Sequence, residues 1–348
     1  MTGERRFPRK LDLAHGRVDL SHGCGGRAMA QLIAEVFAAA FDNPWLAKGN
    51  DQAVLEMPAG RLVMTTDSYV VSPLFFPGGD IGSLAVHGTV NDLAMAGATP
   101  LYLSAGFILE EGFPLADLAR IVAAMAAAAK AAGVAVVTGD TKVVERGKAD
   151  GVFINTAGVG VVGPGVAPSG ERARPGDVIL VSGTLGDHGV AIMSRRENLS
   201  FGTTIESDSA ALHGLVAAMI AVAPDIHCLR DPTRGGLATT LNEIAHQSGV
   251  GMMIREADIP VRPQVAAACE LLGLDPLYVA NEGKLVAIVA PGDAEPVLQA
   301  MRRHPLGAAA AAIGTVYADP HHFVQMVTAL GGRRIVDWLS GEQLPRIC

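Results

Sequence analysis

The alternation of strand-like and helix-like segments limits this chain to few folds. The apolar pattern of strands is found at 52–57, 61–66, 99–108, 134–138, 151–162, 178–182, 251–254, 285–290 and 312–316. Helical periodicity predicts helices near 32–41 and at 80–96, 115–132, 188–196, 209–222, 237–248 and 295–303. Such alternation, with no short-period repeat, is typical of α/β or α+β domains in which helices cover sheets.

The chain breakers of Gly163–Gly170 divide these segments into two sets. The 348 residues are enough for two domains, and this glycine- and proline-rich stretch is the natural linker between them. We therefore predict an N-terminal arm and helix at 1–48, a first domain at 49–165, a second, α/β domain at 170–332 and a tail at 333–348.

Charge and composition exclude several classes of function. The net charge of −8 argues against non-specific nucleic-acid binding, which relies on lysine and arginine against phosphate. The longest uncharged stretch, Gly151–Gly170, is interrupted by glycines and prolines and predicts no membrane span. The first residues lack an apolar signal core, and the four cysteines form no C-x-x-C pair. We therefore expect a soluble, cytoplasmic protein.

One nucleotide motif is a formal match only. Gly158-x-Gly160-x-x-Gly163 has the spacing of a dinucleotide fingerprint and follows a predicted strand. Pro164 and Pro168 forbid the helix whose N-terminus should hold the pyrophosphate. A Walker A sequence is also absent.

Several aspartates stand at strand ends or in the turns that follow them. Carboxylates combined with phosphate oxygens form the usual nucleotide–magnesium site, although an aspartate at a turn can also simply cap a helix. Asp92 lies inside a predicted helix, where a capping role explains it poorly. The set is Asp51, Asp67, Asp92, Asp140, Asp187 and Asp231.

Three further polar residues have two interpretations each. Lys142, in a predicted polar loop after Asp140, could hold a phosphate or be a solvated surface lysine. Glu282 precedes an apolar strand and could be a base or a turn residue. Arg234, with two glycines at a helix start, could meet an anion.

Cys348 is the last residue of the sequence. Pro345 prevents a helix from reaching it, and a thiol at this place cannot serve a core. It is either a reactive thiol kept for chemistry or part of a disordered end. Cys228 and Cys269 lie in apolar settings and are expected in the core.

Together the motifs resemble the HypE family, the carbamoyl dehydratases of [NiFe]-hydrogenase maturation in the PurM-like superfamily. The resemblance runs from about residue 18 to the end, and only the terminal Pro-Arg-Ile-Cys is specific to this family. Cys24 departs from it, because a small residue such as serine or alanine is expected there. The motifs are Ser21-His-Gly-Cys-Gly-Gly26, Thr65-Thr-Asp-Ser68, Val90-Asn-Asp-Leu-Ala-Met-Ala-Gly97, Gly139-Asp-Thr-Lys142, Asp231-Pro-Thr-Arg-Gly-Gly236, Asn281-Glu-Gly283 and Pro345-Arg-Ile-Cys348.

The resemblance implies a PurM-like homodimer whose N-terminal domains share a β-barrel, with ATP bound between the two domains of each chain. It also implies that the carbamoyltransferase HypF loads a carbamoyl group onto Cys348. ATP-dependent dehydration to a thiocyanate would follow, and the cyanide would pass to iron on the HypC–HypD complex. A sixteen-residue tail averages roughly 20–25 Å end to end, enough to swing between the site and a partner.

The resemblance also assigns roles to residues. Cys348 would be the covalent carrier, Glu282 the base, and Lys142 the group that steadies phosphate or amide oxygen. The proposed Mg²⁺ ligands are Asp51, Asp67, Asp92 and Asp140. The proposed ATP- and phosphate-binding residues are His22, Gly23, Asp67, Asn91, Thr141, Asp231 and Arg234.

Two alternatives remain open. Another PurM-like ATP-user, such as a selenophosphate synthetase or an aminoimidazole ribonucleotide synthetase, would share the middle motifs, and the first would work through Cys24. A non-enzymatic scaffold would only present its C-terminal peptide to a partner, and it would hydrolyse no ATP.

Overall fold

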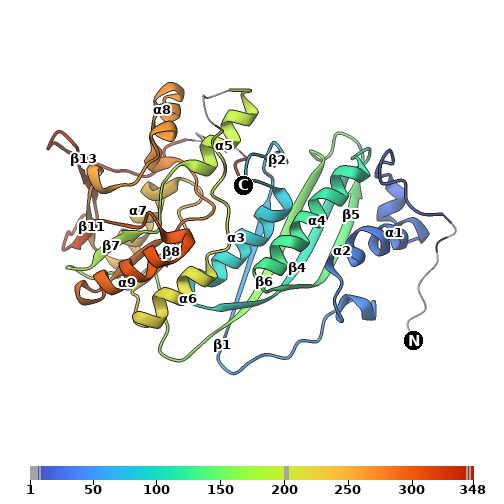
Figure 1. Ribbon diagram of the computed structural model, residues 1–348, viewed down its shortest axis with the longest axis horizontal. Helices are drawn as coiled ribbons and strands as arrows, with labels where there is room; N and C mark the ends of the chain where they lie inside the picture. The colour runs from blue at the N-terminus through green and yellow to red at the C-terminus, as the bar shows by residue number, and fades with distance from the viewer. Residues whose placement is uncertain (1–6, 8, 200–203, 342–343, 345) are drawn as a thin grey trace.

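Two sheets with helices packed on them form the two halves of the computed structural model, which describes residues 7, 9–199, 204–341, 344 and 346–348 (Figure 1). The first sheet has the order β1-β6-β4-β5; β4 and β5 are parallel and the other neighbours antiparallel. Its strands are β1 (Arg61–Tyr69), β4 (Thr99–Glu110), β5 (Ala135–Val144) and β6 (Val152–Val162). Its main helices are α3 (Ile81–Met95) and α4 (Leu115–Ala131).

Helix α3 lies at the centre of the molecule, between the first sheet and the second half (Figure 1). It begins at Asp80, whose side chain accepts the N–H groups of Gly82 and Ser83. The helix is apolar around most of its circumference because it packs on β1, β6, α4 and α6 at once. This position lets a polar side chain of α3 face the space between the halves.

The helices of the first half cover only one face of its sheet. On β4 the inward residues Leu103, Ala105 and Phe107 are buried, in strict alternation with their neighbours. On the other face Leu62 and Met64 of β1 are 64% and 69% exposed. The outer face of the sheet is therefore apolar and uncovered within this chain.

The second half is a seven-stranded sheet with the order β13-β12-β9-β11-β7-β10-β8. Its strands are β7 (Val178–Val181), β8 (Cys228–Arg230), β9 (Gly251–Arg255), β10 (Val286–Val289), β11 (Ala311–Tyr317), β12 (Val324–Val327) and β13 (Arg333–Ile335). Its helices are α5 (Asp187–Arg196), α6 (His213–Val222), α7 (Gly236–Ser248), α8 (Pro263–Leu272) and α9 (Pro291–Arg303). Leu237 of α7 belongs to one core, and Leu215 of α6 and Val297 of α9 to another, so the sheet is covered on both faces.

Short elements complete the chain. The helix expected near 32–41 is present as α1 (Arg27–Leu32), a π-helical stretch (Ile33–Ala38) and α2 (Ala39–Phe41). Strands β2 (Phe75–Phe76) and β3 (Gly79–Asp80) form a small hairpin. Turns of 3₁₀ helix occur at Leu20–Gly23, Leu46–Lys48, Glu256–Asp258, Pro276–Tyr278 and Pro305–Gly307.

Several expectations about elements are wrong. The segment 52–57 is not a strand, because it has no strand beside it within the described chain and only Glu56 O accepts a bond, from Tyr102. Strand β5 continues to Val144, so the loop expected around Lys142 is part of the sheet. Helix α6 begins at His213, four residues later than 209. Strands β8, β12 and β13 and helix α8 were not expected.

The tail is docked rather than free in this structure. Arg333–Ile335 pair with β12 as strand β13, so the first residues of the expected tail belong to the second sheet. At its other end Cys348 O accepts the N–H of Val70 (3.0 Å), next to the end of β1 in the first half. The end of the chain therefore lies between the halves (Figure 1). Pro345 lies outside the described residues, and the swing of the tail stays a prediction.

None of the helices described is both long and apolar enough to cross a membrane.

Candidate functional site

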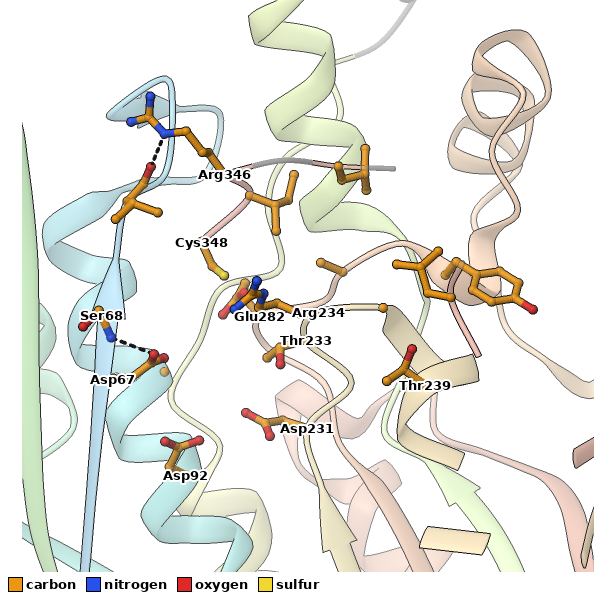
Figure 2. Close-up of a pocket in the computed structure, with 18 of the residues that line it drawn as sticks. Asp67, Ser68, Asp92, Asp231, Thr233, Arg234, Thr239, Glu282, Arg346 and Cys348 are labelled. Atoms are coloured by element: carbon orange, nitrogen blue, oxygen red, sulfur yellow. Dashed lines mark hydrogen bonds between the residues drawn. The ribbon is translucent and has the colours of Figure 1, made fainter. Parts of the chain in front are cut away.

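A cavity of about 690 Å³ lies between the two halves and is closed at one end by the docked tail (Figure 2). Both halves and the tail contribute polar side chains to its wall. The residues labelled in Figure 2 are Asp67, Ser68, Asp92, Asp231, Thr233, Arg234, Thr239, Glu282, Arg346 and Cys348.

The first half contributes an acidic wall. Thr65 and Asp67 are two residues apart on β1 and therefore share the face that meets α3. The Thr65 hydroxyl donates to Asp92 Oδ2 of α3 at 2.8 Å, which holds that carboxylate against the strand. Asp67 and Asp92 thus line the same side of the cavity, as Figure 2 shows.

The second half contributes the turn between β8 and α7. Gly235 and Gly236 have φ values of +76° and +60°, a conformation that favours glycine, and α7 starts at the second of them. The same turn places Asp231 and Arg234 in the cavity wall, with Thr239 of the first turn of α7 nearby. An N-terminal helix end with free N–H groups, combined with a guanidinium, is suited to phosphate.

Burial raises the pKa of several carboxyl groups of the cavity, and neighbouring charges add to the rise. Burial raises the pKa of Asp231 to about 7, and the negative charge of Asp92 adds to the rise. Burial also raises the pKa of Asp92, and Asp67 contributes to it. A cluster of carboxylates that resists ionisation in this way has an affinity for cations.

Glu282 is the most deeply buried of the acidic groups. Its side chain is 3% exposed, and Oε1 has no hydrogen-bond partner among the described residues. Burial raises the pKa of Glu282 well above its usual range, and the charges of Asp231 and Asp208 add to this effect. Its main chain is held from both sides, because Glu282 N donates to Asp208 Oδ1 (3.0 Å) and Glu282 O accepts from Asn91 (3.1 Å). The backbone is therefore fixed, and one carboxyl oxygen is buried without a partner in a residue that lines the cavity.

The sulfur of Cys348 points into the same cavity, toward Glu282 and Arg234 (Figure 2). Burial raises the pKa of this thiol, and the charge of Glu282 raises it further. A thiol in this environment stays protonated and is a weak nucleophile. The docked cysteine is thus suited to carry a group and poorly suited to attack one.

The structure brings together six of the predicted site residues. All six line the cavity, although they come from five separate parts of the sequence. They are Asp67, Asp92, Asp231, Arg234, Glu282 and Cys348.

The predicted residues of β5 lie elsewhere. Asp140 and Lys142 are exposed and pair with each other at 2.6 Å, which lowers the pKa of Asp140. Thr141 is buried beside the N-terminal helix, at a second, apolar cavity. Within this chain these residues do not join Asp67 and Asp92, because β5 is at the opposite edge of the sheet from β1, and their role in the site stays a prediction.

Four further predictions also fall outside the cavity. His22 is buried, accepts the N–H of Asp19, and lies with Gly23 in a turn packed on β5. Asp51 is exposed in an irregular segment. Asn91 is buried one position before Asp92 and holds the main chain of Glu282 instead of lining the cavity. Cys24 is likewise distant, exposed with its thiol on Leu20 O.

Some residues of the cavity were missed by the sequence analysis. Arg346 belongs to the terminal motif, which gave a signal, and its guanidinium donates to Val70 O at 3.0 Å and pairs with Asp150. Thr233 lies within the Asp-Pro-Thr-Arg motif, but nothing marked its side chain. Thr239 and Tyr278 had no sequence signal at all.

The fit of a magnesium ion depends on phosphate. Among the described residues no three His, Cys, Asp or Glu side chains come close enough together to hold an ion alone. Magnesium in nucleotide sites commonly takes one or two carboxylates and fills its shell with phosphate oxygens and water. Asp67, Asp92 and Asp231 are three carboxyl groups in one cavity, and burial raises the pKa of Asp92 and of Asp231, so the set fits that kind of site.

Comparisons with known proteins agree with this geometry. Residues 49–162 match the family model "AIR synthase related protein, N-terminal domain", and residues 174–327 match "AIR synthase related protein, C-terminal domain". Carbamoyl dehydratase HypE of Cupriavidus necator is 71% identical over 98% of this chain and 98% of its own length.

Two solved structures extend the likeness to three dimensions. A HypE crystal structure in complex with ATP has a TM-score of 0.92 and 55% identity, covering 94% of this chain and 99% of that one. The crystal structure of a HypE–HypF complex has a TM-score of 0.78 and 52% identity, with coverages of 88% and 99%. The family choice left open among the PurM-like ATP-users is thereby decided. By motif, fold and sequence identity, the chain belongs to the HypE family, the carbamoyl dehydratases of hydrogenase maturation, whose domains are AIR synthase-related and PurM-like.

Proposed function

We propose that the chain uses ATP to dehydrate a carbamoyl group carried on the sulfur of its own Cys348, giving a thiocyanate. The observation that carries this proposal is the shared cavity of Cys348 and Glu282. Glu282 also has a buried carboxyl oxygen without a hydrogen-bond partner, and its charge acts on the Cys348 thiol, so we assign it the N–H groups of a carbamoyl group on that sulfur. An orphaned buried acceptor is costly unless a ligand satisfies it.

The chemistry divides into two steps. In the first, the carbamoyl oxygen takes the γ-phosphoryl group of ATP, the nitrogen loses one proton, and ADP leaves. In the second, the C–O bond breaks, phosphate departs with the electron pair, and the nitrogen loses its second proton to form the C≡N bond. Glu282 accepts the first proton, and the departing phosphate takes up the second. Its raised pKa makes Glu282 a stronger base than an ordinary carboxylate.

Other residues of the same cavity suit the phosphates. Arg234 and the N-terminus of α7 offer positive charge and N–H donors. We assign Asp67, Asp92 and Asp231 to a magnesium ion shared with ATP, which when bound would neutralise the charge of the phosphates. These residues then position the nucleotide while the tail positions the carbamoyl group.

Two relatives support the proposed partners. One HypE has been crystallised with ATP and another in a complex with HypF. We extend both properties to this chain: ATP as its substrate and HypF as the carbamoyltransferase that loads Cys348. The HypC–HypD complex would receive the cyanide, and the reaction would take place in the cytoplasm.

The uncovered face of the first sheet supports a homodimer. Leu62, Met64 and Ile108 are exposed there, and exposed apolar surface of this kind commonly marks an interface. Both edge strands, β1 and β5, have a free side within the described chain, so two such sheets can close into a barrel. For Asp140 and Lys142 the proposal therefore assigns a role only across the dimer, in the partner's cavity.

Mass spectrometry of the C-terminal peptide tests the reaction. After incubation with the carbamoyl donor system and ATP, the carbamoylated Cys348 peptide should lose the mass of one water, and phosphate should appear in equal amount. Cys24→Ser should behave like the unsubstituted protein, whereas Cys348→Ser should give neither change. Carbamoylated tail that persists in the presence of ATP would rule out the proposal and favour a scaffold.

A further inference from the structure

Each carbonyl of the final tripeptide is held by a donor from the body of the protein. Arg346 O accepts from Ser72 N (3.2 Å) and from Arg196 Nη2 (2.9 Å), and Cys348 O accepts from Val70 N. Between them, Ile347 O accepts from the ring of His188 of α5, with 2.9 Å between Nε2 and O. The two halves therefore share the recognition of the tail, and none of these bonds involves the cysteine sulfur.

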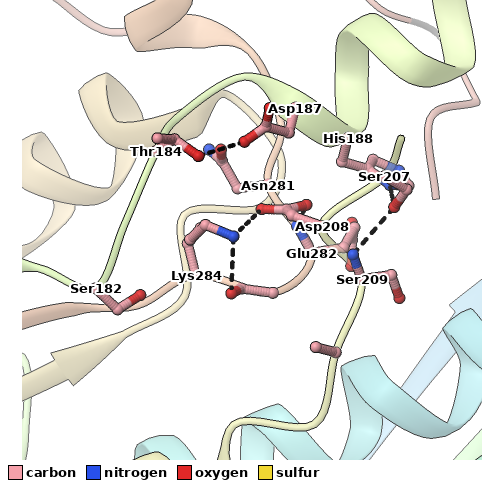
Figure 3. Close-up of polar contacts among 12 residues, drawn as sticks. Ser182, Thr184, Asp187, His188, Ser207, Asp208, Ser209, Asn281, Glu282 and Lys284 are labelled. Atoms are coloured by element: carbon pink, nitrogen blue, oxygen red, sulfur yellow. Dashed lines mark hydrogen bonds and ion pairs between the residues drawn. The ribbon is translucent and has the colours of Figure 1, made fainter. Parts of the chain in front are cut away.

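The ring of His188 is oriented by Ser207, through the ring nitrogen that does not contact the tail. Ser207 Oγ lies 2.8 Å from Nδ1, and Ser207 Oγ also accepts the N–H of Ser209 at 3.0 Å (Figure 3). Because Ile347 O can only accept, Nε2 must carry a proton, and the serine hydroxyl can then donate to Nδ1. Complete burial lowers the pKa of His188, which favours this neutral tautomer.

Asp208, which follows Ser207 in the sequence, holds the loop of Glu282. Asp208 Oδ1 accepts Glu282 N at 3.0 Å, and Lys284 Nζ lies 3.1 Å from Asp208 Oδ2. The side chains of this ion pair are 3% exposed for Asp208 and 11% exposed for Lys284. Figure 3 shows both within one polar network. A Cβ on Gly283 would come within 1.7 Å of Asp208 O, so this close packing requires glycine there. Adjacent residues thus support the tail contact and the base.

We propose that His188 is a positioning residue that recognises the docked tail through the carbonyl of Ile347. We further infer that Ser207 and Asp208 link this contact to the alignment of Glu282. The second part rests on the function proposed above, whereas tail recognition does not. Recognition through main-chain carbonyls explains how one site can hold the tail with different groups on its sulfur.

Two substitutions of His188 distinguish the roles of its two ring nitrogens. The amide nitrogen of glutamine reaches about as far as Nε2, so His188→Gln keeps the donor to Ile347 O. The shorter His188→Asn reaches only the position of Nδ1 and loses that donor. Loss of one such bond costs about 1–1.5 kcal/mol, which is roughly a tenfold change in the docked population.

Alkylation of the full-length protein, followed by peptide mass spectrometry, measures docking directly. His188→Asn should raise the labelling rate of Cys348 about tenfold, while His188→Gln stays within about threefold of the unsubstituted protein. Exposed Cys24 is the internal reference and should react equally in all three proteins. Equal Cys348 rates in His188→Asn and the unsubstituted protein, at matched melting temperatures, would overturn the proposal. So would a His188→Gln protein as reactive as His188→Asn.

Single-turnover dehydration of the carbamoylated protein tests the link to the base. His188→Asn should slow the reaction about tenfold without moving its pH profile, and His188→Gln should restore the rate. A lost limb of the pH profile would instead make His188 an acid–base group and contradict the positioning role. If the unsubstituted protein shows docking but no dehydration, the proposed function fails and the tail recognition stands.

Discussion

Glu282 is buried among other carboxylates and has one unpaired oxygen, so its charge and its proton both bear on function. A positioned general base typically contributes about 10²–10⁴-fold to a rate. Glu282→Gln should therefore slow single-turnover dehydration by about that factor while the alkylation rate of Cys348 changes little. A Glu282→Gln protein that turns over normally would remove this residue from the proton transfer.

The raised pKa of Glu282 gives the reaction a pH dependence. A base acts only when it is deprotonated, so the single-turnover rate should increase with pH until it passes the elevated pKa of Glu282. A rate that shows no rise with pH anywhere in the range where the unsubstituted protein is folded would contradict this assignment. His188→Gln is a suitable control, because it should keep the same profile.

Asp231 should make the nucleotide-free protein less stable at higher pH. Its pKa is about 7 in the folded protein and 3.8 when unperturbed, so the folded state binds the proton more tightly. The stabilisation is complete below about pH 4 and is lost as the pH rises through 7. Asp231→Asn should therefore stabilise the protein more at pH 8 than at pH 5. The difference in the free energy of unfolding should be roughly 1–2 kcal/mol, a value reduced for solvent screening because Asp231 is partly exposed. Urea denaturation at the two pH values measures this, and an equal effect at both would contradict the assignment.

Among the elements, α3 and α4 cross at a contact that only glycine permits. A Cβ on Gly82 of α3 would come within 2.3 Å of Ile121 O, a backbone atom of α4. Gly82→Ala should therefore push the helices apart and destabilise the protein by about 1–3 kcal/mol. Gly292 of α9 is the matched control, since nothing lies within 4 Å of its Cβ position and alanine there should be neutral or slightly stabilising. Equal denaturation midpoints for the two variants would contradict this view of the crossing.

The long elements were predictable because their packing is regular. Helices α3 and α4 and strands β4 and β6 were all expected from periodicity, within one or two residues at most ends. The polar end of β5 was mistaken for a loop, because its strand character comes from pairing with β4 and not from its side chains. Strand β13 was missed for a similar reason: all three of its residues are exposed at a sheet edge.

Residues of the candidate site could be predicted from the sequence where they belong to a family motif. Asp67, Asp92, Asp231, Glu282 and Cys348 do meet in one cavity. Other motif residues support that cavity indirectly or lie at the far edge of the sheet, and spacing along the sequence does not distinguish these positions. His188 had no sequence signal, because its role depends on a carbonyl 159 residues away.

For the whole molecule, the exposed face of the first sheet makes association testable. Met64→Arg would place a charge in the middle of the proposed interface and should convert dimer to monomer in sedimentation velocity experiments. Leu330→Arg is the matched control, because Leu330 is 99% exposed and lies in the turn between β12 and β13, far from that face. A Met64→Arg protein that remains dimeric would place the interface elsewhere.

The hydrogen bonds to the carbonyl oxygens of the tail have a consequence for the direction of the reaction cycle. Because the four donors contact only the backbone of Arg346, Ile347 and Cys348, these contacts are the same for an empty tail, a loaded tail and a finished one. Selection by these backbone contacts therefore cannot drive the cycle forward. Its direction must come from the irreversible consumption of ATP and from whichever partner captures the tail after each release.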